Sequence, residues 1–98
     1  MSLLPNIVFA LLLAAAARAG RAPVVAALLR KGGSVTHSSR SGDSPLMLAI
    51  ASGNAATIGA LLAARSPLDA QNANGNTALM LAARRHDAAA VALLLRAG

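Results

Sequence analysis

The 98-residue chain has no cysteine, tryptophan, tyrosine or glutamate, and it has a single phenylalanine. Without cysteine it forms no disulfide and offers no thiolate for catalysis or metal binding. Alanine makes up about a quarter of the chain and buries little area, so Leu, Val and Ile must supply the core in thin, closely packed layers. Alanine is also the strongest helix former, and the composition therefore favours a small helical fold of one domain.

Acidic residues are scarce as well, since three Asp stand against nine Lys and Arg and give a net charge of +6. This balance weakly favours an acidic partner, such as nucleic acid, an anionic membrane or an acidic protein surface. The basic residues are scattered from Arg18 to Arg96 in runs of no more than two, as on an ordinary solvated surface. Charge alone therefore selects no partner.

The chain contains an internal repeat. SPLMLA begins at Ser44 and TALMLA begins at Thr77, 33 residues later, and Ser41-Gly42 and Asn74-Gly75 precede them at the same offset. Apolar triplets recur with the same period: Val25/Leu28/Leu29, Ile58/Leu61/Leu62 and Val91/Leu94/Leu95. Three units in one register predict a repeat architecture with approximate boundaries 6–38, 39–71 and 72–98, the last one stopping after its second helix.

Each unit is predicted to hold two helices. Ser44 and Thr77 are suitable N-cap residues for the first helix, and Pro45 suits its first turn. The second helix has apolar residues at i, i+3 and i+4, the spacing of one buried stripe. It ends at Gly32 in the first unit and Gly98 in the third, where glycine suits a left-handed cap. The connections between the two helices are Gly20-Arg21, Gly53-Asn54 and His86-Asp87.

The pattern resembles the ankyrin repeat, in which a Gly-containing turn precedes a TPLHLAA helix and a second helix carrying VxxLL. The matching segments are 42–49 and 75–83, and 68–72 looks like the DVNAxD stretch that links units in the family. The resemblance covers nearly the whole chain. It implies an all-α ankyrin-repeat solenoid over residues 1–98, made of stacked helix-turn-helix pairs with β-turn or hairpin finger loops.

Several positions depart from the family pattern. The histidine of TPLH is Met47 and Met80 in the second and third units, and Ala14 in the first. His86 replaces the glycine that connects the helices of the third unit. Arg65 replaces the cap glycine of the second unit, a change that costs about 1 kcal/mol if the residue is left-handed.

The sequence contains no set of residues that could act together in catalysis. The three carboxylates, Asp43, Asp69 and Asp87, fall in turns or loops, and Asp87 is expected to cap a helix rather than to act as an acid or base. His37 has no second His or Cys at ligand spacing. No GK[ST] follows the Gly-containing stretch 72–76, so it is not a phosphate loop. We therefore expect a protein that is not an enzyme and needs neither cofactor nor metal.

The resemblance implies binding of another protein, through the turn tips and the exposed side of the first helices. Arg18, Arg84 and Arg85 would lie along one rim with Ala51 and Ser52 between them, which suits a partner with an acidic surface. Met47 and Met80 are equally well interpreted as packing residues or as contact residues. The candidate partner-binding residues are Arg18, Arg40, Ser41, Asp43, Met47, Ala51, Ser52, Asn72, Asn74, Asn76, Met80, Arg84 and Arg85.

Two other functions stay open at this stage. A basic surface that binds nucleic acid or an anionic membrane is suggested by the net charge, but the chain lacks stacking aromatics and a reader motif, so nucleic acid is the weaker alternative. An exported protein is suggested by the apolar run from Ile7 to Ala17, which is too short to span a bilayer. No Lys or Arg precedes this run, and its Leu13 aligns with Leu46 of the repeat, so a cytoplasmic location is expected.

Both ends of the predicted stack are apolar. Phe9, Ala10 and Leu11 stand where later units have Gly, Asp or Asn, and Ser or Thr, so the first turn is missing or degenerate. Terminal repeats usually carry a polar outer face. The apolar ends predict either a longer array or self-association, and the residues concerned are Leu3, Leu4, Ile7, Val8, Phe9, Val91, Leu93, Leu94 and Leu95.

Overall fold

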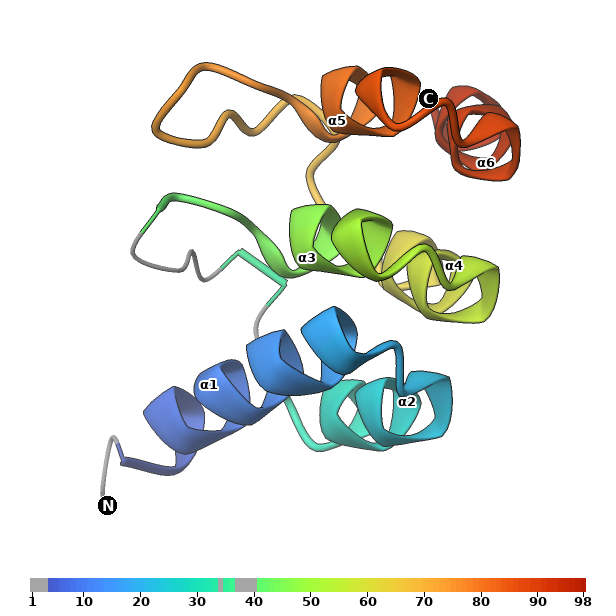
Figure 1. The fold of residues 1–98 in the computed structure, drawn as a ribbon. Helices are drawn as coiled ribbons and strands as arrows, with labels where there is room; N and C mark the ends of the chain where they lie inside the picture. Colours follow the sequence, from blue (N-terminus) through green and yellow to red (C-terminus); the bar gives the residue numbers. More distant parts are fainter. Residues whose placement is uncertain (1–3, 34, 37–40) are drawn as a thin grey trace.

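The computed structural model describes residues 4–33, 35–36 and 41–98, and these contain six helices and no strand. The helices are α1 (Leu4–Ala19), α2 (Ala22–Arg30), α3 (Pro45–Ser52), α4 (Ala55–Ala63), α5 (Ala78–Arg84) and α6 (Ala88–Ala97). They form three pairs stacked in chain order, with α1, α3 and α5 in an inner layer and α2, α4 and α6 in an outer layer (Figure 1). The predicted all-α solenoid is therefore confirmed, and the described segments 41–44 ahead of α3 and 71–77 ahead of α5 project from the inner layer (Figure 1).

Short polar side chains start four of the helices. The hydroxyls of Ser44 and Thr77 accept hydrogen bonds from the backbone N–H three residues later, at 3.2 and 3.3 Å. Asn54 and Asp87 do the same for α4 and α6, at 3.0 and 3.1 Å. These bonds satisfy N–H groups that have no partner within the helix. The predicted capping role of Asp87 is thus confirmed.

Left-handed residues end the helices at equivalent places. Gly20, Gly53 and His86 reverse the chain inside each pair with φ of 72°, 73° and 58°. Gly32 and Arg65 follow the first two outer helices with φ of 93° and 63°. This conformation is open to glycine but costs other residues roughly 1–2 kcal/mol. The repeat therefore retains its backbone geometry at two positions where the sequence has lost glycine.

The first inner helix differs from the other two. It is 16 residues long, whereas α3 has 8 and α5 has 7. The predicted degenerate turn at Phe9, Ala10 and Leu11 is continuous helix, because none of these residues supplies a cap or a left-handed turn. The first pair consequently has a helical extension where the other pairs have a loop.

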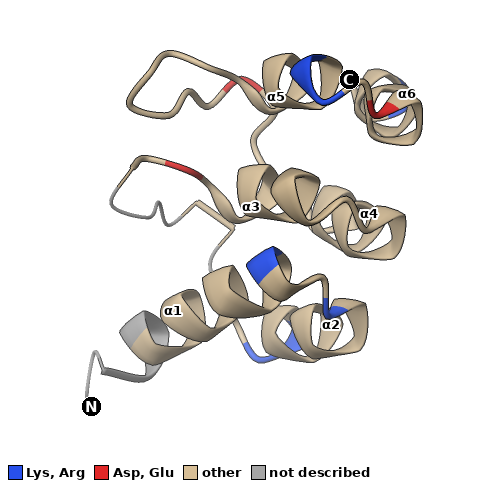
Figure 2. Ribbon diagram, viewed as in Figure 1, with Lys and Arg blue, Asp and Glu red and all other residues tan. Residues whose placement is uncertain are grey.

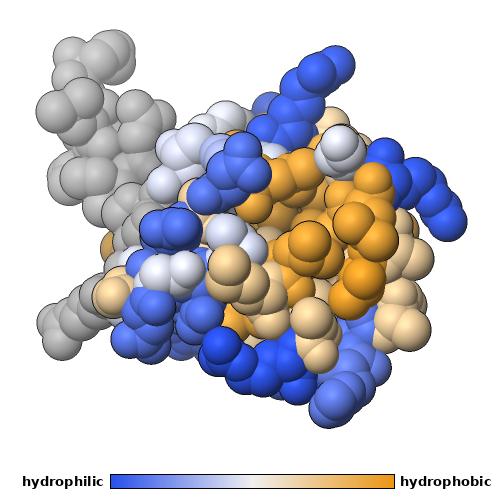
Figure 3. All heavy atoms as spheres, turned by 90° about the horizontal axis from the view of Figure 1, so that it is seen from above, coloured by the Kyte–Doolittle hydropathy of each residue, from blue (hydrophilic) through white to orange (hydrophobic). Residues whose placement is uncertain are grey.

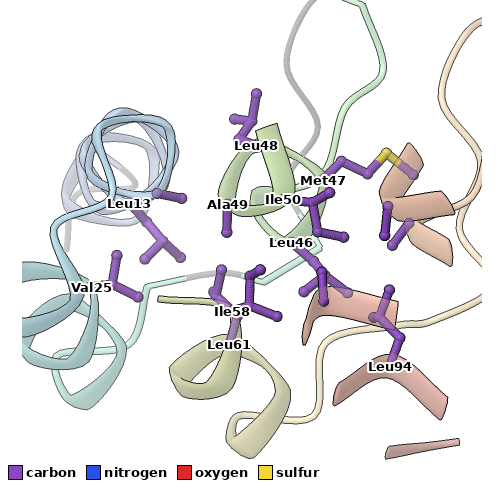
Figure 4. Packing of buried hydrophobic residues seen from close by; sticks show 14 of the residues in the cluster. Leu13, Val25, Leu46, Met47, Leu48, Ala49, Ile50, Ile58, Leu61 and Leu94 are labelled. Atoms are coloured by element: carbon purple, nitrogen blue, oxygen red, sulfur yellow. The ribbon is translucent and has the colours of Figure 1, made fainter. Parts of the chain in front are cut away.

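The core lies between the two layers and between neighbouring pairs. Leu13, Leu46, Ile50, Ile58 and Leu61 are its largest fully buried side chains, and Figure 4 shows Leu13 pointing toward the second pair. Small residues fill the spaces between them, and the buried alanines of this core cluster are Ala16, Ala17, Ala49, Ala78, Ala82 and Ala90. Alanine lets the helices approach closely, so thin layers of Leu and Ile suffice to fill the interior.

One side of the apolar run from Ile7 to Ala17 belongs to this core. Its Leu13, Ala16 and Ala17 are buried, and α1 packs on both α2 and α3. None of the helices in the described part of the chain is sufficiently long and apolar to cross a membrane. The buried side of the run therefore serves packing between the first two pairs, whereas Val8, Leu11 and Leu12 are exposed.

Arg65→Gly and His86→Gly should each stabilise the fold. The left-handed penalty of a non-glycine residue is relieved, while the freer unfolded chain offsets part of the gain, so we expect up to about 1 kcal/mol more free energy of unfolding. Urea unfolding followed by circular dichroism measures the difference. Ala64→Gly is the control, because Ala64 has a φ of −85° and glycine there should only destabilise. If all three variants changed the free energy of unfolding equally, left-handed strain at Arg65 and His86 would not be the cause.

Candidate functional site

The finger loop before α5 is organised around Asn72. Its side-chain oxygen accepts hydrogen bonds from the backbone N–H groups of Asn74 and Asn76, at 2.9 and 3.0 Å. The backbone N–H of Asn72 donates to the backbone carbonyl of Asn76 at 3.0 Å, and the backbone carbonyl of Asn72 accepts from the N–H of Gly75 at 2.9 Å. One asparagine thereby closes the turn from both sides, in the manner of an Asx turn.

The same asparagine joins this finger to the one before it. The Asn72 side-chain amide donates to a carboxylate oxygen of Asp43 at 3.0 Å, and the N–H of Ala73 donates to the carbonyl of Ser41 at 3.0 Å. The other carboxylate oxygen of Asp43 accepts from the Ser41 hydroxyl at 2.9 Å. Gly42 makes the approach possible, because a Cβ added there would lie 2.8 Å from the backbone nitrogen of Ala73.

A hollow of about 280 Å³ lies between these fingers and the inner helices α3 and α5. Apolar side chains from the two helices and polar side chains from the fingers meet in it. Its lining residues are Asp43, Met47, Leu48, Ala51, Asn72, Asn74, Asn76, Leu81, Arg84 and Arg85. A mixed lining of this kind can hold a peptide backbone and a few side chains.

Two arginines lie at the helix end of the hollow. Arg84 donates a hydrogen bond to the side-chain oxygen of Asn76 at 3.2 Å, which ties the end of α5 to its own finger. A guanidinium has five N–H donors, so this bond leaves donors for a ligand. Arg85 reaches back to the second pair, where an added Cβ on Gly53 would lie 3.9 Å from its Nη2. Both side chains are exposed.

Two of the three inner helices, α1 and α5, carry basic residues at their C-terminal ends. Figure 2 shows basic residues at the C-terminal ends of α1 and α5 and none on α3 between them, and these residues include Arg18 and Arg84 in the last turns. Asp43 is the one carboxylate among the lining residues of the hollow, and it is engaged by Ser41 and Asn72. The hollow therefore offers net positive charge to a ligand.

Comparison with known families matches residues 11–98 to the family described as ankyrin repeats in three copies. The chain belongs to the ankyrin-repeat family. Ankyrin repeats are generally non-catalytic modules that bind other proteins. A search of curated proteins found no match. In the described part of the chain, no three His, Asp or other ligating side chains are grouped as a metal ion requires.

The hollow brings together many, but not all, of the residues predicted to bind a partner. Arg18, Ser41, Ser52 and Met80 lie outside its lining. The Ser52 hydroxyl donates to the carbonyl of Ala49 at 2.5 Å and accepts from the N–H of Asn54 at 3.3 Å, so it supports the connection between α3 and α4. Arg40, and also His37, lie outside the described residues.

The two methionines of the ankyrin TPLH position have different surroundings. Met47 is buried and points from α3 toward α5 (Figure 4), which makes it a packing residue beneath the hollow. Met80, its equivalent in the third pair, is exposed. Leu48 and Leu81 line the hollow although the sequence pattern assigned them only to the apolar side of the helices. Their spacing of 33 residues was the available signal.

Gly42→Ala should separate the two fingers. The new Cβ would clash with the backbone of Ala73, and alanine would be strained at the left-handed φ of 81°. We therefore expect a loss of about 2–3 kcal/mol in the free energy of unfolding. The amide of Ala73 should also exchange faster with solvent, because its hydrogen bond to Ser41 is lost. Chemical unfolding and amide exchange by NMR measure the two effects.

Gly75→Ala is the matched control for this substitution. Gly75 has a φ of 78°, but a Cβ there meets nothing within 4 Å. It should therefore cost only the left-handed strain of about 1 kcal/mol and leave the Ala73 amide protected. If the two variants behaved alike, backbone strain rather than contact between the fingers would explain the requirement for glycine.

Proposed function

We propose that this ankyrin-repeat protein binds an acidic segment of another protein in the hollow between its fingers and inner helices. The supporting observation is the presence of Arg84 and Arg85 beside a row of asparagine side chains, over a floor of apolar residues. Arginine recognises carboxylates through paired N–H donors. The asparagine amides supply both donors and acceptors for a peptide backbone.

The fold favours recognition rather than catalysis. Stacked units create a continuous surface in which each unit contributes the same positions with different side chains. Positions 51 and 84 illustrate this, because both line the hollow and one is Ala while the other is Arg. The small side chain of Ala51 on α3 leaves room for a ligand, and Arg84 and Arg85 at the end of α5 provide charge at the edge of the hollow.

Arg84→Glu combined with Arg85→Glu should abolish selection of acidic peptides. Peptides selected by the unmodified protein from a random display library are expected to be enriched in Asp and Glu, and the double variant is expected to weaken their binding about tenfold or more. Binding should also weaken with added salt, because exposed charges are screened. Fluorescence anisotropy with the selected peptides measures both effects.

Arg30→Glu combined with Arg96→Glu is the control with the same change in net charge. Both arginines are exposed in the last turns of outer helices and lie outside the hollow. This control should bind the selected peptides as the unmodified protein does. Equal losses in both double variants would mean that binding follows overall charge, as for nucleic acid, and selected peptides without acidic enrichment would contradict the proposal directly.

A further inference from the structure

Residues at equivalent positions of the three pairs show which contacts bury each face. A position that is buried in the first two pairs and exposed in the third owes its burial to the pair that follows. A position that is exposed in the first pair and buried in the other two owes its burial to the pair that precedes. The repeat thus supplies its own internal control for the two sides of the stacking interface.

The outer face of the third pair carries the side that a following pair would cover. Leu13 and Leu46 are fully buried, whereas their equivalent Leu79 is 38% exposed. Met47 is buried and Met80 is 49% exposed, and Leu95 is 63% exposed whereas its equivalents Leu29 and Leu62 are half-buried. Figure 3, a view onto this end of the stack, shows a continuous apolar patch across α5 and α6. We call this surface the C-end face.

The outer face of the first pair carries the complementary side. Leu12 of α1 is 48% exposed, whereas its equivalents Pro45 and Ala78 are buried. Val24 of α2 is 42% exposed, and its equivalents Thr57 and Ala90 are buried as well. We call this surface the N-end face. The exposed Val8 and Leu11 lie on the same side of α1 as Leu12, because residues three and four positions apart are neighbours on a helix.

We propose that two copies of this chain stack head to tail, with the N-end face of one copy on the C-end face of the other. The contact continues the interface that already joins the second and third pairs, since each face occupies the register positions that its counterpart uses there. Val24 has nearly the shape of Thr57, and Leu12 is somewhat larger than Pro45, so the incoming face is close to that of the second pair. Burial of the exposed leucines and valines drives the association.

This contact is heterologous, so it leaves one free C-end face and one free N-end face on every assembly. Further copies add to these faces, and the assembly grows with protein concentration. An isologous arrangement, with two C-end faces packed together, would instead stop at a dimer. The two arrangements therefore differ in both size and mutational response.

Glutamate substitutions at one face at a time test the arrangement. Leu95→Glu blocks the C-end face and Val24→Glu blocks the N-end face, and both side chains are sufficiently exposed for the change to leave the core intact. The unmodified chain should show an average mass in sedimentation velocity that rises beyond a dimer with concentration. Each single variant should associate about tenfold or more weakly, because one half of every contact is impaired.

A mixture of the two variants decides the geometry. The intact C-end face of the Val24→Glu chain can accept the intact N-end face of the Leu95→Glu chain, so the mixture should form a 1:1 dimer that does not grow. Ala56→Glu is the matched control, because this exposed residue belongs to the middle pair, whose two stacking faces are covered. It should associate like the unmodified chain.

Two results would overturn the proposal. One is a monomer at every concentration of the unmodified chain, and the other is a single-face variant that associates by itself as strongly as the unmodified chain. Circular dichroism verifies that each variant is folded, and Leu12→Glu replaces Val24→Glu if the latter is not. The experiment contains no peptide ligand, so its outcome is independent of binding in the hollow.

Discussion

The apolar face of each helix pair is buried by the neighbouring pairs, and the rest of the structure depends on that contact. All helices except α1 have 7 to 10 residues. Helices of this length are marginally stable in isolation and gain their stability from packing. The many alanines bring the pairs close together, so a thin layer of Leu and Ile between them is sufficient. Equivalent leucines are buried or exposed according to whether a neighbouring pair covers them, which shows that burial here is a property of the stack.

The stack also determines where chemistry is possible. Because the pairs are translated copies, side chains at equivalent positions of α1, α3 and α5 form rows along the inner face. The two described finger segments are held together by Asn72, Asp43 and the close approach at Gly42, so the hollow beside them has a fixed wall. Different side chains at equivalent positions, such as Ala51 on α3 and Arg84 on α5, then make the helix side of the hollow apolar at one place and charged at another, without altering the backbone.

Much of this arrangement was predictable because it rests on local rules. The backbone geometry of a single turn determines where capping residues and left-handed residues are needed. The 33-residue register then gives the equivalent positions in the other units, including those of Arg65 and His86. The role of Ser52 was not predictable in this way, because its hydroxyl serves the connection to α4 rather than the exposed rim. The different exposure of Met47 and Met80 was likewise undecided, since it depends on the neighbouring pair.

The sequence by itself determined the helix pairs, their order and their period, because capping, helix propensity and apolar spacing act over a few residues. It also determined that the first unit lacks an ordinary turn. Only the tertiary structure decided that α1 continues through that position, that the fingers touch through Asn72, and that Arg84 and Arg85 border one hollow with Asp43. These features depend on distances between residues far apart in the chain, and those distances are set by how closely alanine-rich helices pack.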